Sequence, residues 1–339
     1  MRFPGFTDEW KKTTLGEIAI SISAGKSGNP NEDGKYDLYG STGKIGRTNN
    51  GDYEGEKILV ARVGANAGKI NYNDVKCGIT DNTLIVQPNG VSTKYIYYHL
   101  IHSNLNRLVF GSGQPLITGG MLKKLILNVP SIPESERIVK LLESIDLRIT
   151  TQHKIIDNLQ SLIKGLAKTL THQKEPNVRI SDCLECHTST LQEGTLNENG
   201  QYPVYGASGI AGFLDDYRCK EDSIQIIKDG SGVGTVSYTT GEYSVIGTLN
   251  YLTAKSGYSL KYLYFCLMSF NFKPFKTGMA IPHIYFKDYG KAKIYCPTIE
   301  EQKRIATTLT AIENKLNIEL RLLNILHMWK QHLLNSMFI

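Results

Sequence analysis

The sequence has no apolar run that approaches the roughly 20 residues needed to cross a lipid bilayer. Its first ten residues, MRFPGFTDEW, lack the apolar segment of a secretory signal. We therefore expect a cytoplasmic chain, in which the six cysteines among 339 residues are reduced thiols rather than a disulfide framework. These absences exclude membrane proteins and small disulfide-stabilised secreted domains.

Catalytic motifs are missing as well. The chain has no Asn/Asp-Pro-Pro-aromatic segment of the kind an amino-methyltransferase uses, no HExxH and no GxSxG. Its formal net charge of +6 suits an anionic partner, although an excess of this size is weak evidence by itself. A chain this long without a catalytic constellation is more typical of a binding subunit than of an enzyme.

One stretch of the chain is written twice. Residues 31–46 read NEDGKYDLYGSTGKIG and residues 197–212 read NENGQYPVYGASGIAG, with eight identities at an offset of 166. The repeat continues in KILVARVGANAGKINY and SIQIIKDGSGVGTVSY, in YIYYHLI and YLYFCLM, and in IPESERIVKLLESIDLRI and IEEQKRIATTLTAIENKL. Because the offset is about half the chain length, the protein is a tandem duplication rather than a solenoid of short repeats.

Each copy is predicted to be a β-rich globular part followed by a long helix, an α+β fold. Asp33-Gly34 and Asn199-Gly200 predict hairpin turns. Buried strands are expected at 57–63 and 223–228, and short aromatic-rich helices at 94–106 and 260–270. The predicted boundaries are residues 1–130 for the first globular domain, 131–172 for the central helix, 173–297 for the second globular domain and 298–339 for the distal helix.

The two long helices carry apolar residues at alternating steps of four and three, the pattern of a coiled coil. A whole domain connects them, which permits antiparallel pairing. Gln152 and Glu319 interrupt the seam; they either meet in a polar layer that sets the register or point to solvent. The predicted seam consists of Ile138, Leu142, Ile145, Ile149, Gln152, Ile156, Leu159, Ile163, Leu166, Ile305, Leu309, Ile312, Leu316, Glu319, Leu323, Leu326 and Leu333.

The segment CLECH matches the C-x-x-C-H pattern of c-type haem attachment, with Cys183 and Cys186 as thioether residues and His187 as axial ligand. Alignment of the two copies at this point places Ile18, Ser21 and Ile22 opposite them. The shared fold does not need these groups, and no second Cys/His pair stands at zinc-site spacing. We expect free thiols and no metal.

Two glycine loops resemble nucleotide-binding sites, and one charged turn resembles part of a nuclease active site. GANAGK (64–69) and GSGVGT (230–235) lack the spacing of a Walker loop or a dinucleotide site, so glycine turns between strands are expected. Asp33-Gly34-Lys35 could be part of a nuclease site, but its counterpart Asn199-Gly200-Gln201 could neither bind metal strongly nor stabilise a leaving group. Neither motif predicts catalysis.

Basic residues decorate both copies and suit contacts with phosphates and base edges, although each could equally be a solvated surface group. In the second copy, Ile210 and Phe213 stand opposite Lys44 and Arg47, so a basic edge becomes apolar. The candidate DNA-binding residues are Lys26, Lys44, Arg47, Arg62, Lys69 and Arg107 in the first copy, and Arg218, Lys228, Lys273, Lys276, His283, Lys287, Lys291 and Lys293 in the second.

The chain resembles the specificity subunit of type I restriction–modification systems. The resemblance covers nearly the whole chain and rests on FPGFTDEWKKTTLGEI, on YGSTGKIG and YGASGIAG, on ILVARVGANAGKI and its repeat, and above all on VPSIPESERIVKLLESID and CPTIEEQKRIATTLTAIE. In that family the globular parts are target recognition domains and the helices are spacer regions.

The resemblance implies a non-catalytic subunit. Each recognition domain would read one half of a bipartite, asymmetric double-stranded DNA target in the major groove. The paired helices would set the gap and dock two modification (methyltransferase) subunits, with restriction subunits joining the complex. S-adenosylmethionine, ATP and magnesium would be used by these partners, not by this chain. The alternatives are the specificity chain of a bipartite-site type II system, a duplicated coiled-coil interaction scaffold, and a nucleotide- or haem-dependent enzyme.

Overall fold

The chain folds into two compact units, and the computed structural model describes residues 2–111 and 115–338. The first unit comprises residues 1–151 and 322–339, and the second comprises residues 152–321. The division passes through both long helices, so each unit contains one globular part and a half of each helix. Within the described residues, no helix combines the length and the apolar character needed to span a membrane.

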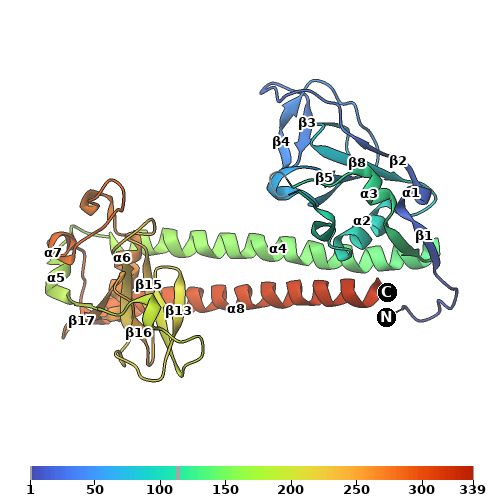
Figure 1. Ribbon diagram of the computed structural model, residues 1–339. Coiled ribbons are helices and arrows are strands. Elements are labelled where there is room, and N and C mark those ends of the chain that lie inside the picture. The colour runs from blue at the N-terminus through green and yellow to red at the C-terminus, as the bar shows by residue number, and fades with distance from the viewer. Residues whose placement is uncertain (1, 112–114, 339) are drawn as a thin grey trace. The chain divides into compact units, whose positions relative to one another are not determined.

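The first unit is built from three small antiparallel or mixed sheets laid against helices (Figure 1). The strand orders are β2-β8-β5-β6, β4-β3-β7 and β1-β9. Its elements are β1 (Lys11–Thr14), α1 (Leu15–Ile18), β2 (Ala19–Ala24), β3 (Tyr36–Gly40), β4 (Gly43–Thr48), β5 (Lys57–Ala61), η1 (Gly64–Asn66), β6 (Ile70–Asn73), β7 (Cys77–Ile79), β8 (Thr83–Pro88), α2 (Thr93–His102), η2 (Leu105–Leu108), α3 (Gly119–Lys123), β9 (Ile126–Val129) and the start of α4 (Ile132–Thr171).

The second unit repeats this topology sheet for sheet. Its strand orders are β11-β17-β14-β15, β13-β12-β16 and β10-β18. Its elements are β10 (Val178–Arg179), α5 (Ile180–Cys183), β11 (Leu184–Thr188), η3 (Glu193–Thr195), β12 (Tyr202–Gly206), β13 (Gly209–Leu214), β14 (Ser223–Ile227), β15 (Val236–Thr239), β16 (Ser244–Val245), β17 (Leu249–Ala254), α6 (Leu260–Ser269), η4 (Lys273–Phe275), α7 (Phe286–Tyr289), β18 (Lys293–Ile294) and the start of α8 (Ile299–Met337). The tandem duplication predicted from the sequence is therefore a duplication of fold.

The short helix of each unit is placed by the same two devices. The hydroxyls of Ser92 and Ser259 cap α2 and α6 by accepting a backbone N–H, which satisfies one of the unpaired donors of a helix start. The buried tyrosines Tyr95 and Tyr262 each donate a hydrogen bond of 2.7 Å to a carbonyl oxygen, that of Asn128 or Tyr295. Repeated sequence thus produces repeated packing.

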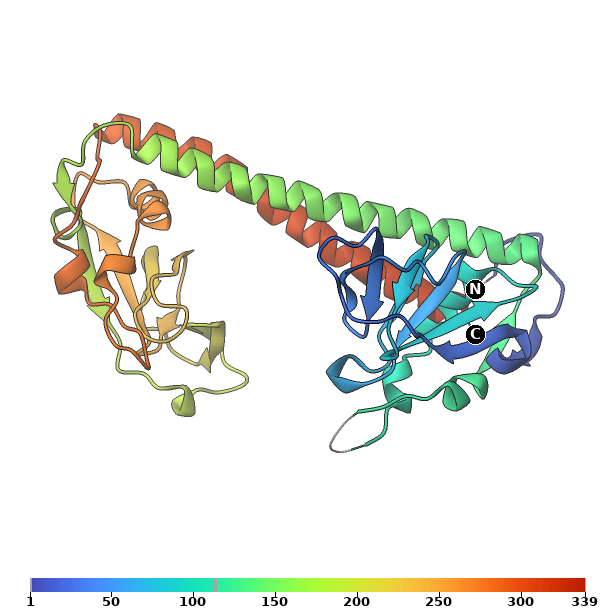
Figure 2. The ribbon, with the colours of Figure 1, turned by 90° about the horizontal axis from the view of Figure 1, so that it is seen from above.

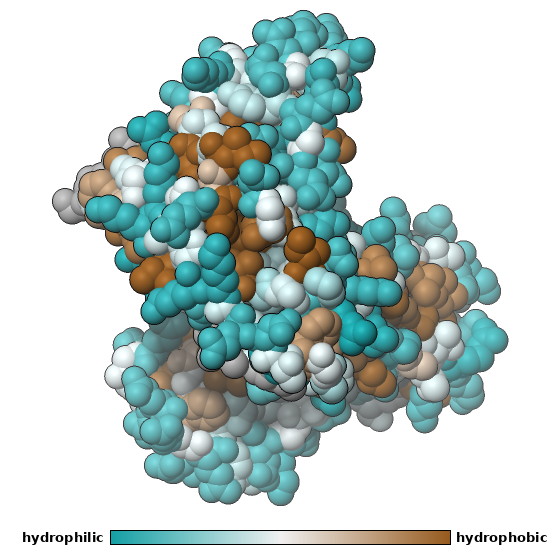
Figure 3. Space-filling model, turned by 90° about the vertical axis from the view of Figure 1, so that its right-hand side faces the viewer, coloured by the Kyte–Doolittle hydropathy of each residue, from teal (hydrophilic) through white to brown (hydrophobic). Residues whose placement is uncertain are grey.

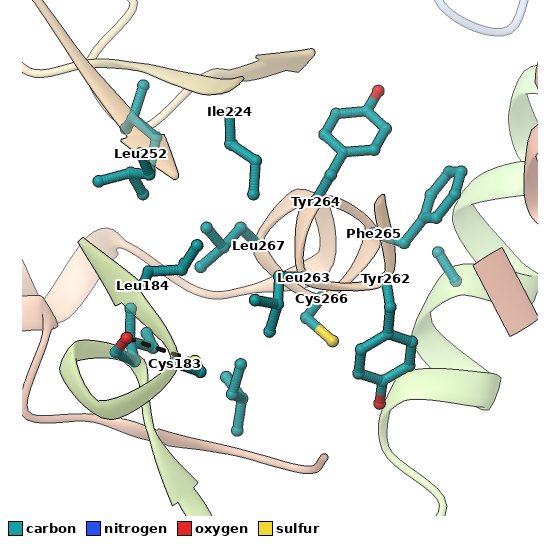
Figure 4. Packing of buried hydrophobic residues seen from close by; sticks show 14 of the residues in the cluster. Cys183, Leu184, Ile224, Leu252, Tyr262, Leu263, Tyr264, Phe265, Cys266 and Leu267 are labelled. Atoms are coloured by element: carbon teal, nitrogen blue, oxygen red, sulfur yellow. Dashed lines mark hydrogen bonds between the residues drawn. The ribbon is translucent and has the colours of Figure 1, made fainter. Parts of the chain in front are cut away.

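The core of the second unit lies between β14, β17 and α6 (Figure 4). Ile224 and Leu252 point from the strands toward Leu263 and Leu267 of α6, while Cys183 and Leu184 close the cluster from α5 and β11. The run YLYFCL is buried on every side, which is why it shows no polar face in the sequence. A helix that is buried on all sides is stabilised by tertiary packing rather than by the helix propensity of its residues.

The hairpin turns differ from those predicted. The pairing of β3 with β4 and of β12 with β13 runs up to the glycines of YGSTG and YGASG, so the turn lies there. The prediction that Asp33-Gly34 and Asn199-Gly200 form the turns is wrong. A Cβ at Gly34 would overlap the backbone of Thr48, and one at Gly200 would stand 2.9 Å from the backbone of Leu214. These glycines permit close backbone approach.

In the first unit, α4 and α8 lie side by side and run antiparallel (Figures 1 and 2). Ile138 and Leu142 share a core with Met337 and Phe338. Further along, Lys330 makes an ion pair of 2.5 Å with Asp146, which also accepts a hydrogen bond of 2.8 Å from Tyr98. At this end Leu334 is the buried residue, and the predicted Leu333 is only half-buried.

In the second unit the same helices meet around a polar layer. Gln152 donates one hydrogen bond to the carbonyl oxygen of Glu319 at 3.0 Å and another to its carboxylate. Both side chains are buried, with exposed fractions of 5% and 6%. Lys315 pairs with the same carboxylate, and these two partners, Lys315 first, lower the pKa of Glu319. All seventeen predicted seam residues are buried or half-buried.

A lysine in each unit fastens the globular part to its long helix. Lys94 makes an ion pair of 2.5 Å with Glu143 on α4 and lies 5.3 Å from the ring centre of Tyr72. Its counterpart Lys261 makes an ion pair of 2.7 Å with Glu313 on α8 and lies 4.0 Å from the ring centre of Tyr238. Since a cation between an aromatic face and a carboxylate is stabilised by both, this contact orients each globular part on the helix.

The polar layer generates a stability prediction. Replacing Gln152 by leucine leaves the buried Glu319 with fewer partners, and we expect a loss of about 1–3 kcal/mol in the free energy of unfolding. Replacing both residues by leucine removes the unpaired groups, so much of the loss should return. Urea unfolding followed by circular dichroism measures both. A double variant no more stable than Gln152→Leu would contradict a pairwise role.

A histidine in the first unit, His99, is buried among aromatic side chains. His99 packs against Tyr95 and Phe338 at ring separations of 6.1 and 5.2 Å and lies near His102. The backbone N–H of Asn128 donates to its Nε2 at 3.4 Å, which requires an unprotonated Nε2. Burial lowers the pKa of His99 to about 4.

We predict that this histidine makes the protein acid-sensitive. The unfolded histidine titrates near pH 6.5, so stability contributed by the neutral folded form is present above that pH. It is lost as the pH falls from about 6.5 toward 4, by up to about 1.4 kcal/mol per pH unit. The second unit has Cys266 at the equivalent position, so His99→Cys is a matched control. Urea midpoints measured between pH 7.5 and 5 should fall more steeply for the wild type; parallel curves would refute the assignment.

Candidate nucleic-acid interface

The first basic group lies on the β3–β4 hairpin. Lys44 and Arg47 project from β4 toward Asp37 on β3, at 2.8 and 3.8 Å. All three side chains reach solvent, and the two cations are more than half exposed. Surface ion pairs of this kind contribute little stability. The cluster therefore holds two cations in place with a net charge of about +1 and leaves them available to a partner.

The second feature is a groove beside this hairpin. Ser27 shapes it, because its hydroxyl donates to Asp52 at 2.5 Å and accepts the N–H of Ile79 at 3.0 Å. The groove is open, has a volume of about 460 Å³ and presents one cation, the carboxylate of Asp81, hydroxyls and amides. Such groups suit backbone phosphates and base edges. It is lined by Lys26, Ser27, Gly28, Asn29, Pro30, Gly40, Ser41, Ile45, Thr80, Asp81 and Asn82.

Arg62 and Lys228 occupy the same position in the two units. Arg62 follows β5; its N–H bonds the carbonyl of Asn82 and its carbonyl accepts the N–H of Ile117, both at 2.9 Å. Lys228 follows β14 and makes the equivalent bonds with Thr248 and Ile284, at 3.0 and 2.9 Å. Both copies thus hold a cation at one backbone site, which favours a shared role.

The remaining candidates of the first unit gather elsewhere. Lys69 borders a shallow hollow formed by the glycine loop and residues 104–106, and Arg107 follows on η2. The loop itself is a 3₁₀ turn in which Gly64 and Gly68 have φ of +77° and +87°, a conformation that side chains rarely adopt. The glycines of GANAGK therefore serve the turn, as predicted.

In the second unit, His283 stands where three segments meet. It forms β-bridges with both Asp229 and Thr277. Lys276 directly precedes Thr277, and the Nζ of Lys287 lies 5.2 Å from the ring centre of Tyr285. These residues, with Lys228 and Lys273, form one group around the loop 277–283.

Three candidates of the second unit lie apart from that group. Arg218 borders a hollow with His187 and Tyr251. Lys293 is in β18, which pairs with β10 next to α5, and Lys291 precedes it. The structure therefore does not bring these lysines together with Lys228 and His283.

The second hairpin replaces the whole charged cluster, not only its cations. By strand register, Asp37 faces Arg47 in the first unit, while Pro203 faces Phe213 in the second. Tyr39 faces Lys44, and Tyr205 faces Ile210, which is 55% exposed. The carboxylate partner Asp37 was missed from the sequence, although its loss together with both cations in the second copy was a visible signal.

Among the described residues, which include the CLECH segment, no group of three or more His, Cys, Asp or Glu could hold a metal ion. Burial raises the pKa of the Cys186 thiol to about 11. His187 stacks on Tyr251 and lies 3.0 Å from the hydroxyl of Thr253. The strand register makes Ile22, rather than the predicted Ser21, the first-unit equivalent of Cys186. The one-residue difference arises because β2 contains a bulge after Ala19.

Comparisons with known proteins agree on one family. The family model described as "Type I restriction modification DNA specificity domain" matches residues 7–161 and again residues 175–327. The type I restriction enzyme EcoprrI specificity subunit of Escherichia coli is 29% identical over 146 residues, 41% of this chain and 36% of that protein. A putative type I specificity subunit of Mycoplasma pneumoniae is 28% identical over 134 residues, 38% of this chain and 44% of that protein. The matched segments thus span less than half of these relatives.

Solved structures share the fold over the full length. The S subunit of a type I restriction–modification system from M. genitalium superposes with a TM-score of 0.73 at 18% identity, covering 99% of this chain and 97% of its own. A chain from a study of complex assembly and conformational transition of the type I R-M system superposes with a TM-score of 0.56 at 14% identity and covers 98% of both chains.

The Asp37 cluster yields a direct prediction. Asp37→Ala removes the carboxylate that both Lys44 and Arg47 share, so the hairpin should bind polyanions more tightly. On a heparin column the variant should elute at higher salt than Glu198→Ala, which removes the same charge from an exposed position of the second unit. Equal elution of the two variants would mean that the two cations do not face the polyanion.

Proposed function

Because this chain belongs to the type I restriction–modification DNA specificity family, we propose that it is the non-catalytic DNA-recognition subunit of such a system. One frame occurs twice with different side chains on equivalent edges, and this is the observation that carries the proposal. A protein that reads one bipartite, asymmetric target needs this combination of repeated scaffold and divergent surface. Residues 1–130 and 173–297 would be the two target recognition domains.

Each unit would read its half-site through groups of the kind described above. Cations such as Arg62 and Lys228 suit phosphates, which fix position but carry no sequence information. Specificity would come from groups that differ between the units. Lys44 and Arg47 suit acceptors such as guanine O6 and N7, whereas Ile210 and Phe213 suit a thymine methyl group in the major groove.

The helices would act as a spacer between the two half-sites. A helix of 40 residues, the length of α4, extends for roughly 60 Å at 1.5 Å per residue. That exceeds the roughly 34–36 Å of one turn of B-DNA. The buried layer of Gln152 and Glu319 supports this role, since a polar pair in an apolar seam disfavours slippage.

Exposed apolar side chains on the helices suit the docking of modification subunits. In the second unit Ile155 and Leu162 are 38% and 47% exposed, and in the first unit their repeat equivalents Leu322 and Trp329 are 41% and 59% exposed. Apolar groups also reach the surface in the face shown in Figure 3. Two equivalent stripes would bind two copies of one partner. S-adenosylmethionine, ATP and magnesium would be held by the modification and restriction subunits.

The decisive experiment is methylome sequencing of cells that carry this chain with its modification subunits. We expect one bipartite target. Replacing residues 1–130 by another such domain should change one half-site only. Inserting one helical turn into α4 should change the gap and leave both half-sites intact, because the insertion moves the readers without altering them. The matched control is an insertion of equal length at Gly194, an exposed position with open space around it, which should leave the target unchanged.

Two results would overturn the proposal. A half-site that changes when the helix is lengthened would refute the spacer. DNA binding by the reconstituted complex that is indifferent to both sequence and salt would refute the recognition role, since phosphate contacts make the logarithm of affinity fall linearly with the logarithm of salt concentration.

A further inference from the structure

The second unit projects an apolar tip into solvent from the loop between η4 and α7. Met279 is fully exposed and Ile281 is 66% exposed, and Ala280 between them is also exposed. Exposed apolar groups that stand together mark interaction sites more often than isolated ones do. The cations of this region were predicted from the sequence, whereas its apolar tip was not.

The tip is held in one shape. Thr277 and His283 close the loop with two backbone hydrogen bonds, from N–H to carbonyl in both directions, at 2.9 and 2.8 Å. Gly278 has a φ of +86°, and a Cβ there would overlap the carbonyl oxygen of Ile281. A loop that is already held in one conformation loses less entropy on binding than a flexible loop does. This loop is therefore preorganised for binding.

The base of the loop is tied to the frame at the shared basic position. The N–H of Gly230 donates to the carbonyl of Pro282, and the N–H of Ile284 donates to the carbonyl of Lys228, both at 2.9 Å. In the first unit, Val63, Phe110 and Leu116 form the equivalent bridges. By these bridges Phe110, which is 51% exposed, corresponds to Thr277 at the base of the loop, so the two units carry different side chains at this attachment point.

Lysines flank the tip along the chain. Lys273 and Lys276 precede it, Lys287 follows it, and all three are exposed. Asp288 follows Lys287, and Asp229 forms a β-bridge with His283 at the base of the loop, so these three lysines outnumber the two acids. An apolar centre inside a basic rim complements a surface whose apolar centre lies between two rows of anions. Nucleic acid has that arrangement, with bases between phosphate strands.

We propose that the loop Thr277–His283 places Met279 and Ile281 against bases of the half-site read by the second unit, while Lys273 and Lys276 contact the flanking phosphates. The apolar tip meets either a thymine C5-methyl group or the face of a partly unstacked base step. This inference rests on the proposed function and adds specificity-determining residues to it.

The test uses the reconstituted complex of the full chain with its modification subunits. A target is first selected from a randomised duplex pool with the wild-type complex. Met279→Ser combined with Ile281→Ser should lower affinity for that target about tenfold, leave affinity for an unselected duplex unchanged, and relax base preference in the second half-site only. For this tip variant, the slope of the logarithm of affinity against the logarithm of salt concentration should stay the same. In contrast, Lys273→Ala combined with Lys276→Ala should lower the magnitude of that slope by about one for each phosphate that the variant no longer binds.

Two controls keep the outcome interpretable. Val75→Ser alters a residue of similar exposure in the first unit, at 54%, and should change nothing. Gly278→Ala keeps every apolar side chain but strains the loop, and should reproduce the tenfold loss without lowering the thermal midpoint of the complex. Replacing single thymines by uracil in the second half-site distinguishes the two kinds of base contact. If the tip meets a thymine methyl group, uracil at that position should lower the affinity; if the tip enters an unstacked base step, affinity should be unchanged and the bound DNA should be bent.

Specific results would overturn the inference. If the wild-type complex binds selectively and the tip variant binds equally well with an unchanged preference, the loop is not a reader. If the tip variant no longer assembles with modification subunits, the tip belongs to a protein interface. If the wild-type complex itself shows no sequence-selective, salt-dependent binding, the proposed function fails before the loop is tested.

Discussion

A buried polar contact in an apolar seam, that of Gln152 with Glu319, is the constraint on which the rest of the structure depends. Sliding one helix along the other by a turn would leave a carboxylate and an amide buried without partners, at a cost of several kcal/mol. The register of α4 and α8 is therefore set at one point. Each globular part is fastened to its own helix by a lysine, Lys94 to Glu143 on α4 and Lys261 to Glu313 on α8.

The duplication shows which interactions the frame requires and which it tolerates. The tyrosines that bond carbonyl oxygens at the base of α2 and α6 occur in both copies. At another buried position the two copies use different residues with different hydrogen-bond partners. Lys57 is buried with its ammonium on two carbonyl oxygens, while its counterpart Ser223 accepts a hydrogen bond from Tyr243. Because each buried substitution of this kind keeps its hydrogen bonds, the fold is preserved while the surface residues of the two copies differ.

Those surfaces are where the two units differ in chemistry. On the first hairpin a carboxylate holds two cations in a defined arrangement, and on the second the same three positions are apolar. The loop after η4 carries Thr277 at its base, and in the first unit the exposed ring of Phe110 stands at the equivalent position. On the proposed function, these differences convert a symmetric scaffold into a reader of an asymmetric target. The cation at the shared position of Arg62 and Lys228 would supply affinity for both half-sites.

The sequence by itself determined the duplication, the two long helices and the buried strands, because all of these follow from periodicity and from identity at a constant offset. That Gln152 and Glu319 meet in a polar layer rather than point to solvent was decided by the tertiary structure. Only the tertiary structure decided which cations form one group. Lys293 is close in sequence to His283 yet lies in β18, which pairs with β10, and Lys291 lies in the turn before β18. Asp37 becomes the partner of Lys44 and Arg47 only through the pairing of β3 with β4. The sequence of Asp33-Gly34 and Asn199-Gly200 is typical of a hairpin turn, whereas these glycines lie outside the two hairpin turns and allow two backbone segments to approach closely. Such contacts join residues far apart in the chain, and local pattern carries no information about them.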